Sequence, residues 1–324
     1  MLRIRFRRAQ TAGSGARVRG RRCGRLLRWV GAAGLAVGAH GAALALQVFA
    51  CEPEWAALVR ELAPHAQVRS ATHALQDPHH IEARPSLIAQ LRRADLAVCT
   101  GAALESGWLP TLQQRSGNPK VQEGAAGMFY AADHVALIDP KPPGTPYDGD
   151  VHEQGNPHVH LDPRRVRDVA RALAEQLQAI DPPRRSVYRD QLGKFEASWR
   201  ERTAAWERRA APVRGKRIAA QHSTYAYLWH WLGIEQIADL EPKPGLPPTP
   251  GHLQRVLTMT RPNPPKAIVV SSYQDARPAR WLADQLGAST QVLQLPATVT
   301  DDAVAPDLNA LFDLLVNRLV ETLR

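Results

Sequence analysis

The chain has 324 residues, of which 41 are Lys or Arg and 31 are Asp or Glu, so its formal net charge at pH 7 is +10. Apolar residues make up 44% and charged residues 22%, which excludes an intrinsically disordered chain. A basic balance ordinarily suggests nucleic acid or an acidic membrane surface as a partner. However, residues 1–45 contain ten arginines and no acid, and the remainder carries equal numbers of basic and acidic residues. We therefore expect no nucleic-acid binding.

Residues 1–45 have the pattern of a secretory signal peptide. After the arginines comes an uncharged run rich in Ala and Gly, from Trp29 to about Leu46, which is shorter and more interrupted than a stable membrane span. The run includes Ala43-Leu44-Ala45, a typical cleavage pattern. We expect cleavage after Ala45 and a periplasmic location, with a retained signal anchor as the alternative. The pair Arg21-Arg22 is followed by a poor match to the twin-arginine consensus, so general secretion is favoured.

Two of the three cysteines lie beyond this leader, and each follows an apolar strand-like run. In an exported chain Cys51 and Cys99 can oxidise to a disulfide. Buried free thiols, acting as small apolar residues, are an equally good interpretation.

The first half of the chain alternates between apolar strand patterns and helical patterns. Strands are predicted at 47–51, 67–71 and 95–99, with helices at 54–62 and 85–94. Residues 130–157 are dense in Pro, Gly, Asp and His, which indicates a long surface loop. Strands that alternate with helices are typical of a parallel, doubly wound sheet.

The second half repeats this alternation. It predicts strands at 217–221, 234–240, 267–271 and 291–295, with helices at 224–232, 250–260 and 279–286 and a last helix from about residue 306. Between the halves, aromatic and apolar residues recur at mostly helical intervals from Asp181 to about Ala211. A helix of roughly 28 residues would span about 40 Å and join the halves stiffly. The predicted fold is therefore α/β, with two doubly wound βα lobes joined by one long rigid backbone helix.

The domain boundaries follow from this organisation. We expect a signal peptide at 1–45, an N-terminal metal-binding lobe at 46–181, the connecting helix at 182–211 and a C-terminal metal-binding lobe at 212–324.

Histidines stand where predicted strands end, which is where doubly wound folds bind ligands. His79 follows the second strand, His158 closes the long loop, and His222 follows the first strand of the second half. Imidazole is a strong zinc ligand, but these spacings are far too wide for a zinc-finger clip, so any site must be assembled by tertiary folding. An isolated loop histidine is more often a solvated polar residue, and we expect that of His65, His73, His134, His152, His230 and His252.

Three segments carry a family resemblance. Asp77-Pro78-His79 with the later Thr100-Gly101-Ala102-Ala103-Leu104-Glu105, then Asn156-Pro157-His158-Val159-His160, then Gln221-His222-Ser223-Thr224 resemble the metal-binding solute-binding proteins of ABC importers for zinc and manganese. The resemblance covers essentially residues 47–324. It implies that His79, His158 and His222 are metal ligands. His80 would face away from His79 on an extended chain, and His160 could be an alternative ligand or a residue that supports one.

The fourth ligand is where this chain departs from the family. The family usually has a Glu or Asp in the loop after the strand at 267–270, whereas this chain reads Ser271-Ser272-Tyr273-Gln274-Asp275. Asp275 is the only acid within reach and is the predicted fourth ligand, with water or a non-protein ligand as the alternative. Three imidazoles with at most one carboxylate favour zinc over manganese, which prefers oxygen donors.

The resemblance implies a periplasmic binding protein, not an enzyme, that captures a divalent metal ion between two lobes and delivers it to an ABC permease of the inner membrane. We expect it to act as a monomer. One alternative is a zinc hydrolase, because three histidines and a water can also catalyse hydrolysis, with Glu82 or Glu105 as the base. Another is a periplasmic metal chaperone or adhesin on the same fold.

Overall fold

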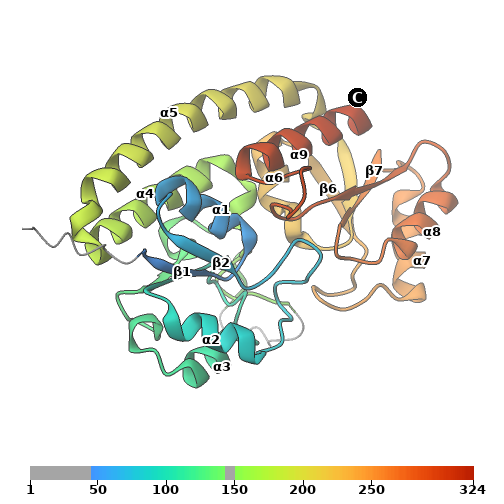
Figure 1. Ribbon diagram of the computed structural model, residues 1–324. Helices are drawn as coiled ribbons and strands as arrows, with labels where there is room; N and C mark the ends of the chain where they lie inside the picture. The colour runs from blue at the N-terminus through green and yellow to red at the C-terminus, as the bar shows by residue number, and fades with distance from the viewer. Residues whose placement is uncertain (1–44, 143–149) are drawn as a thin grey trace, which may run out of the picture. The chain divides into compact units, whose positions relative to one another are not determined.

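The computed structural model describes residues 45–142 and 150–324, which belong to one compact unit that begins at Leu44 (Figure 1). The predicted signal peptide therefore lies outside the described residues, except for its last residue. Within the described part of the chain, no helix combines the length and the apolar character needed to cross a membrane.

The first half of the unit forms a parallel sheet of four strands, in the order β2-β1-β3-β4. Its strands are β1 (Gln47–Ala50), β2 (Gln67–Ser70), β3 (Leu96–Cys99) and β4 (Met128–Tyr130). The helices of this half are α1 (Pro53–Leu62), α2 (Pro85–Arg93) and α3 (Leu109–Ser116). Helix α3 and the short strand β4 had not been predicted.

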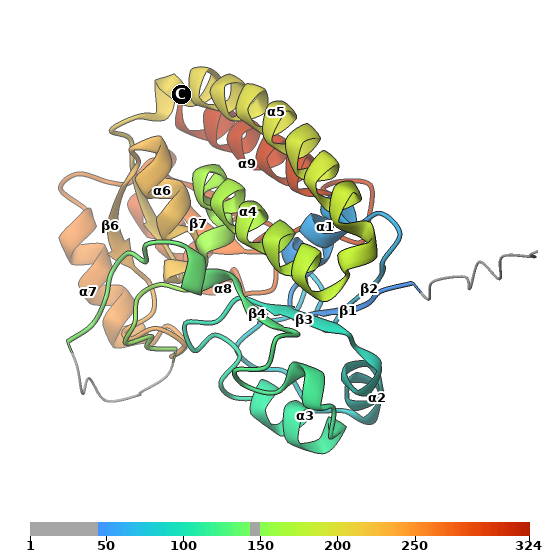
Figure 2. The same ribbon diagram turned by 90° about the vertical axis from the view of Figure 1, so that its left-hand side faces the viewer.

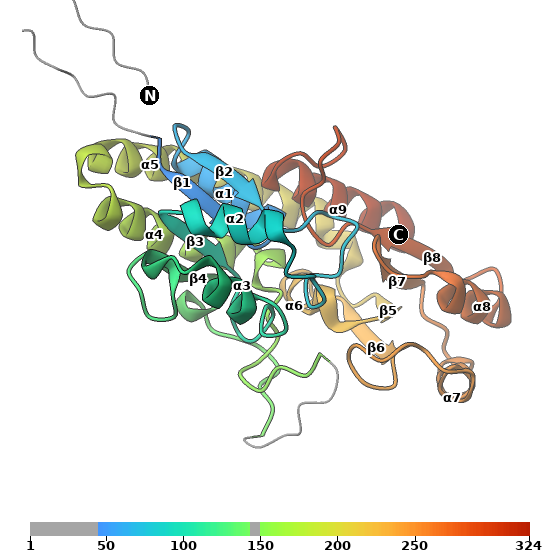
Figure 3. The same ribbon diagram turned by 60° about the horizontal axis from the view of Figure 1, so that its bottom comes forward.

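The second half repeats the arrangement with the sheet order β6-β5-β7-β8. Its strands are β5 (Arg217–Ala220), β6 (Glu235–Asp239), β7 (Ala267–Ser271) and β8 (Gln291–Leu295). Its helices are α6 (Ala226–Leu232), α7 (Pro250–Thr260), α8 (Arg277–Leu286) and α9 (Leu308–Leu323). Figure 3 shows the two groups of strands side by side. The predicted α/β fold of two doubly wound lobes is confirmed.

Two long helices join the halves. Helix α4 (Pro163–Ile180) leads through a short 3-10 turn to α5 (Arg185–Ala210), whose 26 residues are the predicted connecting helix. Helix α5 packs against α4, α1 and α9, and Figure 2 shows α5 and α9 running along each other. Helix α4 had not been predicted, although its buried residues recur at helical spacing.

One hydrophobic core runs beneath both sheets. It contains Val48 and Ala50 of β1, Ile218 and Ala220 of β5, and buried residues of α1, α4, α5, α6 and α9. Because alternate strand residues point to opposite faces, Phe49 instead packs with α2 and α3, and the outer face of the second sheet packs against α7 and α8. The long helices and this common core hold the two sheets, and so their strand ends, in fixed positions relative to each other.

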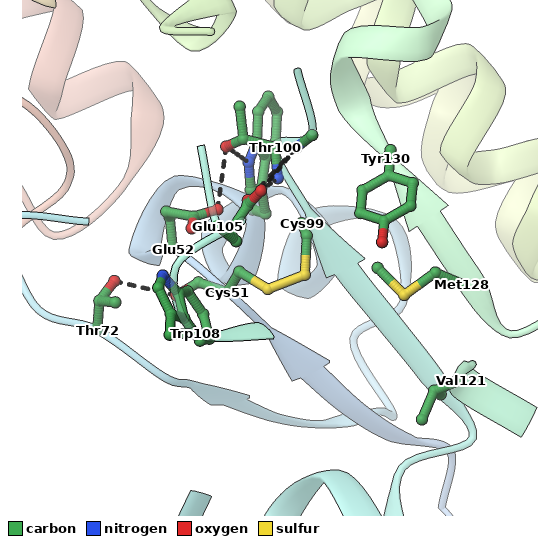
Figure 4. The surroundings of a disulfide bond; sticks show 12 residues. Cys51, Glu52, Thr72, Cys99, Thr100, Glu105, Trp108, Val121, Met128 and Tyr130 are labelled. Carbon is green, nitrogen blue, oxygen red and sulfur yellow. Dashed lines mark hydrogen bonds between the residues drawn. A yellow bond between two sulfur atoms is a disulfide. The ribbon is translucent and has the colours of Figure 1, made fainter. Parts of the chain in front are cut away.

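Cys51 and Cys99 form a disulfide, so the free-thiol alternative is wrong. It joins the end of β3 to the residue after β1, with the two Cα atoms 4.8 Å apart (Figure 4). Both side chains are completely buried in the small core under α2 and α3. The bond therefore fixes the carboxyl edge of the first sheet, where the chain leaves β1 and β3 for the loops that surround the site.

Candidate metal centre

Three buried histidines from three separate segments converge between the two sheets. His79 lies in the loop after β2, His158 in the segment before α4, and His222 directly after β5. Each offers one ring nitrogen, and these three atoms lie within 4.8 Å of one another. The side chains are 6%, 2% and 6% exposed, so the cluster is shielded from bulk water. The structure thus brings together the three histidines that the resemblance implied.

The backbone and its neighbours hold each ring in place. Asp77 Oδ1 accepts hydrogen bonds from the backbone N–H of His79 at 3.0 Å and from its Nδ1 at 2.7 Å. Glu241 Oε2 accepts from His222 Nδ1 at 2.7 Å. The His158 backbone N–H donates to Asn156 Oδ1 at 2.9 Å. No role had been predicted from the sequence for either Asp77, which was quoted only as part of a motif, or Glu241.

These contacts decide which ring nitrogen is free. An ionised carboxylate can only accept, so in the neutral rings of His79 and His222 it is Nδ1 that carries the proton and Nε2 that keeps its lone pair. Nε2 of His79 and of His158 is buried and has no hydrogen-bond partner. A buried polar atom without a partner costs about 1–3 kcal/mol, and a divalent cation at the centre of the cluster would satisfy both atoms.

The charges around the cluster favour a bound cation. Burial and the neighbouring imidazoles, His79 first, lower the pKa of His158 well below its usual range, so this ring is neutral at pH 7. Burial is the largest single influence on the pKa of His222 and lowers it, but the hydrogen bond and charge of Glu241, with the charges of Asp150 and Asp77, together raise it by more, so the net pKa is raised. Two carboxylates thus stand directly behind the ligand nitrogens, where they balance the charge of an ion.

His152, which we expected to be a solvated loop residue, is buried beside the cluster. It is 7% exposed, and its ring centroid lies 5.3 Å from that of His79. Its Nδ1 lies 2.9 Å from the carbonyl oxygen of Ala102, while its Nε2 is buried without a partner. Burial, followed by the charge of His79, lowers the pKa of His152 to about 3, so the ring is neutral. The expectation that it is solvated is wrong.

The structure does not bring Asp275 into the cluster. Its side chain is 47% exposed, and its carboxylate accepts hydrogen bonds from the backbone N–H and the guanidinium of Arg277. It belongs to none of the groups of three or more potential ligand atoms found within 4.8 Å of one another in the described residues. Its position therefore gives the prediction of a fourth ligand no support.

His80 and His160 also lie outside the cluster. The side chain of His80 is 67% exposed, and its Nε2 lies 3.4 Å from Asp150 Oδ1. Asp150 Oδ2 lies 3.9 Å from His79 Nδ1, so both rings approach the same carboxylate and His80 does not face away from His79 as expected. Both ring nitrogens of His160 have protein neighbours: Nε2 lies 2.7 Å from the carbonyl oxygen of Ala297, and Nδ1 lies 3.1 Å from Glu54 Oε1. His160 Nε2 therefore ties the His158 segment to the loop after β8, whereas Nδ1 is buried beside Glu54 of α1 without a hydrogen-bond partner.

Two open pockets reach the cluster from the surface. They have volumes of about 550 and 600 Å³, and both are lined by Asp150, Gln221, His222 and Glu241. Asp275 lines the second pocket, at some remove from the histidines. Carboxylates therefore line both pockets together with His222.

Known proteins share this architecture. The family model described as "Zinc-uptake complex component A periplasmic" matches residues 48–322. The chain is 24% identical over 228 residues to the high-affinity zinc uptake system protein ZnuA of Bacillus subtilis, a match that spans 67% of each protein. It is 24% identical to the manganese ABC transporter substrate-binding lipoprotein PsaA of Streptococcus pneumoniae, over 64% of this chain and 66% of that protein.

Solved structures share the fold. A crystal structure of ZnuA superposes with a TM-score of 0.73 at 18% identity, covering 86% of this chain and 100% of the other. A manganese-bound periplasmic metal-binding protein from Candidatus Liberibacter asiaticus gives a TM-score of 0.67 at 20% identity, covering 86% and 99%. The extent of the family match decides the assignment: the chain belongs to the family of periplasmic zinc-uptake complex component A proteins, the ZnuA family.

Proposed function

We propose that this protein captures a zinc ion between its two lobes and delivers it to an ABC permease in the inner membrane. The observation that carries the proposal is the convergence of His79, His158 and His222, whose ligand atoms lie within 4.8 Å of one another in a buried cluster. His79 and His158 belong to the first half of the chain and His222 to the second, so an ion would bridge the two lobes.

Zinc is the cation that this donor set fits best. Imidazole nitrogens suit zinc, whereas manganese prefers carboxylate, carbonyl and water oxygens and a higher coordination number. The carboxylates of Asp77 and Glu241 contact Nδ1 atoms, on the side of each ring away from Nε2. They therefore orient the rings and raise their basicity without being donors to the ion.

The surroundings of the cluster support transport over catalysis. Glu82, one candidate base of a hydrolase, is exposed, and the carboxylate of Glu105 is occupied by the backbone N–H groups of Thr100 and Gly101. We propose that the protein catalyses no reaction, is exported to the periplasm by residues 1–45, acts as a monomer and does not bind nucleic acid. The core shared by both lobes supports a small closing motion on metal binding.

Calorimetric zinc titration of the mature protein tests the ligand assignment. His79→Ala, His158→Ala and His222→Ala should each weaken zinc binding at least a hundredfold while far-UV circular dichroism stays unchanged. Asp275→Ala is the matched control, because it removes a carboxylate that lines the second pocket but lies outside the histidine cluster, and it should leave the affinity unchanged. Unaltered zinc affinity in all three histidine variants would show that the ion binds elsewhere.

Vesicles that hold the permease and its ATPase test delivery. Zinc-loaded protein should support ATP-dependent uptake of zinc, and manganese-loaded protein should not support uptake of manganese. Uptake that does not depend on the binding protein would refute the proposed partner.

A further inference from the structure

We propose that His152 is the fourth ligand of the transported ion, and that a left-handed turn at Gly101–Ala103 holds its ring ready for that role. The proposal rests on the zinc-binding function above and names a residue that closes the coordination sphere. It would make the donor set four imidazoles in place of three imidazoles and a water.

The turn has an unfavourable left-handed backbone conformation. Gly101, Ala102 and Ala103 have φ values of 79°, 49° and 65°, so three consecutive residues are left-handed and two of them carry a Cβ. Each such alanine costs about 1–2 kcal/mol relative to a right-handed conformation. Strain of this kind persists only where neighbouring groups impose it, and it concentrates at functional sites.

Hydrogen bonds from buried neighbours hold the residues at the start of the turn. Glu105 accepts hydrogen bonds from the backbone N–H of Thr100 at 2.5 Å and of Gly101 at 3.0 Å. The hydroxyl of Thr100 donates to Glu52 and accepts from the Trp55 indole, at 3.0 and 2.8 Å (Figure 4). All of these groups are buried, and the segment starts directly after the disulfide residue Cys99.

This turn places the carbonyl group of Ala102 next to the ring of His152. The oxygen of Ala102 lies 2.9 Å from Nδ1 of His152, and a carbonyl can only accept. The proton of the neutral ring is thereby assigned to Nδ1, and Nε2 is left as a lone-pair donor. Asp77 does the same for His79 and Glu241 does the same for His222. His152 is therefore prepared as a ligand in the manner of the cluster histidines.

Nε2 of His152 makes no hydrogen bond to any other described residue. Nε2 is buried and unpartnered, as Nε2 of His79 and of His158 is. It is not one of the three atoms within 4.8 Å of one another, although the His152 ring lies 5.3 Å from that of His79. Coordination by all four rings therefore requires Nε2 of His152 to move closer to the other three nitrogen atoms, while the Ala102 carbonyl already fixes the orientation of the ring.

X-ray absorption at the zinc edge of the loaded protein tests the proposal directly. The unmodified protein should show four imidazole ligands, and His152→Ala should show three with an added oxygen and a zinc affinity at least tenfold lower. His252→Ala is the matched control: its ring likewise lies 2.9 Å from a backbone carbonyl, that of Asp239, but it is only partly buried and belongs to none of the clusters of potential ligands in the described residues, so the number of ligands and the affinity should not change. Three imidazoles in the unmodified protein would overturn the proposal.

Two further variants separate the ligand from its support. His152→Asp should lower the ratio of zinc to manganese affinity, because it supplies an oxygen donor. Glu105→Gln should weaken zinc binding by a smaller factor, and this loss should vanish in the His152→Ala background, as a double-mutant cycle requires for a residue that acts through another. An equal loss in both backgrounds would refute the positioning role of Glu105.

Failure of this proposal is distinguishable from failure of the proposed function. If His152→Ala is silent while His79→Ala weakens binding, His152 is not a ligand and zinc capture stands. If His79→Ala, His158→Ala and His222→Ala are all silent, the zinc-capture function itself is wrong.

Discussion

Removing the Cys51–Cys99 disulfide should lower the free energy of unfolding of the metal-free protein by about 4 kcal/mol. The two cysteines are 48 residues apart in the sequence. Closing a loop of that length in the unfolded chain removes about 14 cal/mol/K of entropy, which is about 4 kcal/mol at 25 °C. The bond is buried within the small core under α2 and α3, so a reductant reaches it only when that region opens.

The measurement is urea unfolding in a chelator, with and without a dithiol reductant. A loss of about 4 kcal/mol moves the midpoint by between about 1 and 4 M urea, given typical slopes of 1–3 kcal/mol/M. The double variant Cys51→Ala/Cys99→Ala is the control, because it should unfold early and show no response to the reductant. Identical midpoints for the oxidised and reduced unmodified protein would refute the reasoning.

Three other perturbations have defined outcomes. Gly245→Ala should weaken zinc binding and lower stability, because φ there is +79° and a Cβ would lie 2.5 Å from Asp150 Oδ2; zinc titration and urea unfolding check it. Ala103→Gly should raise the free energy of unfolding by about 1 kcal/mol, since an exposed left-handed alanine becomes glycine; an unchanged urea midpoint would contradict it. Burial, with the charges of Glu105 and Glu54, raises the pKa of Glu52, so the folded state keeps a proton that the unfolded state loses above about pH 4.5. The free energy of unfolding should therefore fall between pH 5 and pH 8, and it should fall less in Glu52→Gln than in the unmodified protein.

Much of the fold could be predicted because its strands are short apolar runs bounded by turn residues. The exceptions have local causes. Strand β4 has only three residues, too few for a pattern, and it is defined by its pairing with β3. Helix α4 has a clear stripe of buried residues that the prediction did not use.

The site was only partly predictable. His79, His158 and His222 stand in recognisable segments, but the position of His152 depends on the carbonyl of Ala102, 50 residues earlier in the chain. No local pattern encodes that contact. Asp275 shows the opposite case, because Arg277 two residues later offers its guanidinium and satisfies the carboxylate locally.

Because one core runs beneath both sheets, the folding of the first half depends on residues that come late in the chain. Helix α9, the last element of the chain, packs on α5 and α1, and its buried residues belong to the same core as strand β1. A chain cut at residue 181 would therefore leave the buried apolar residues of β1, α1 and α4 without their partners on α5 and α9. We therefore expect neither half to fold stably as a separate unit. Assembly of the histidine cluster, which draws on both halves, therefore depends on this common core.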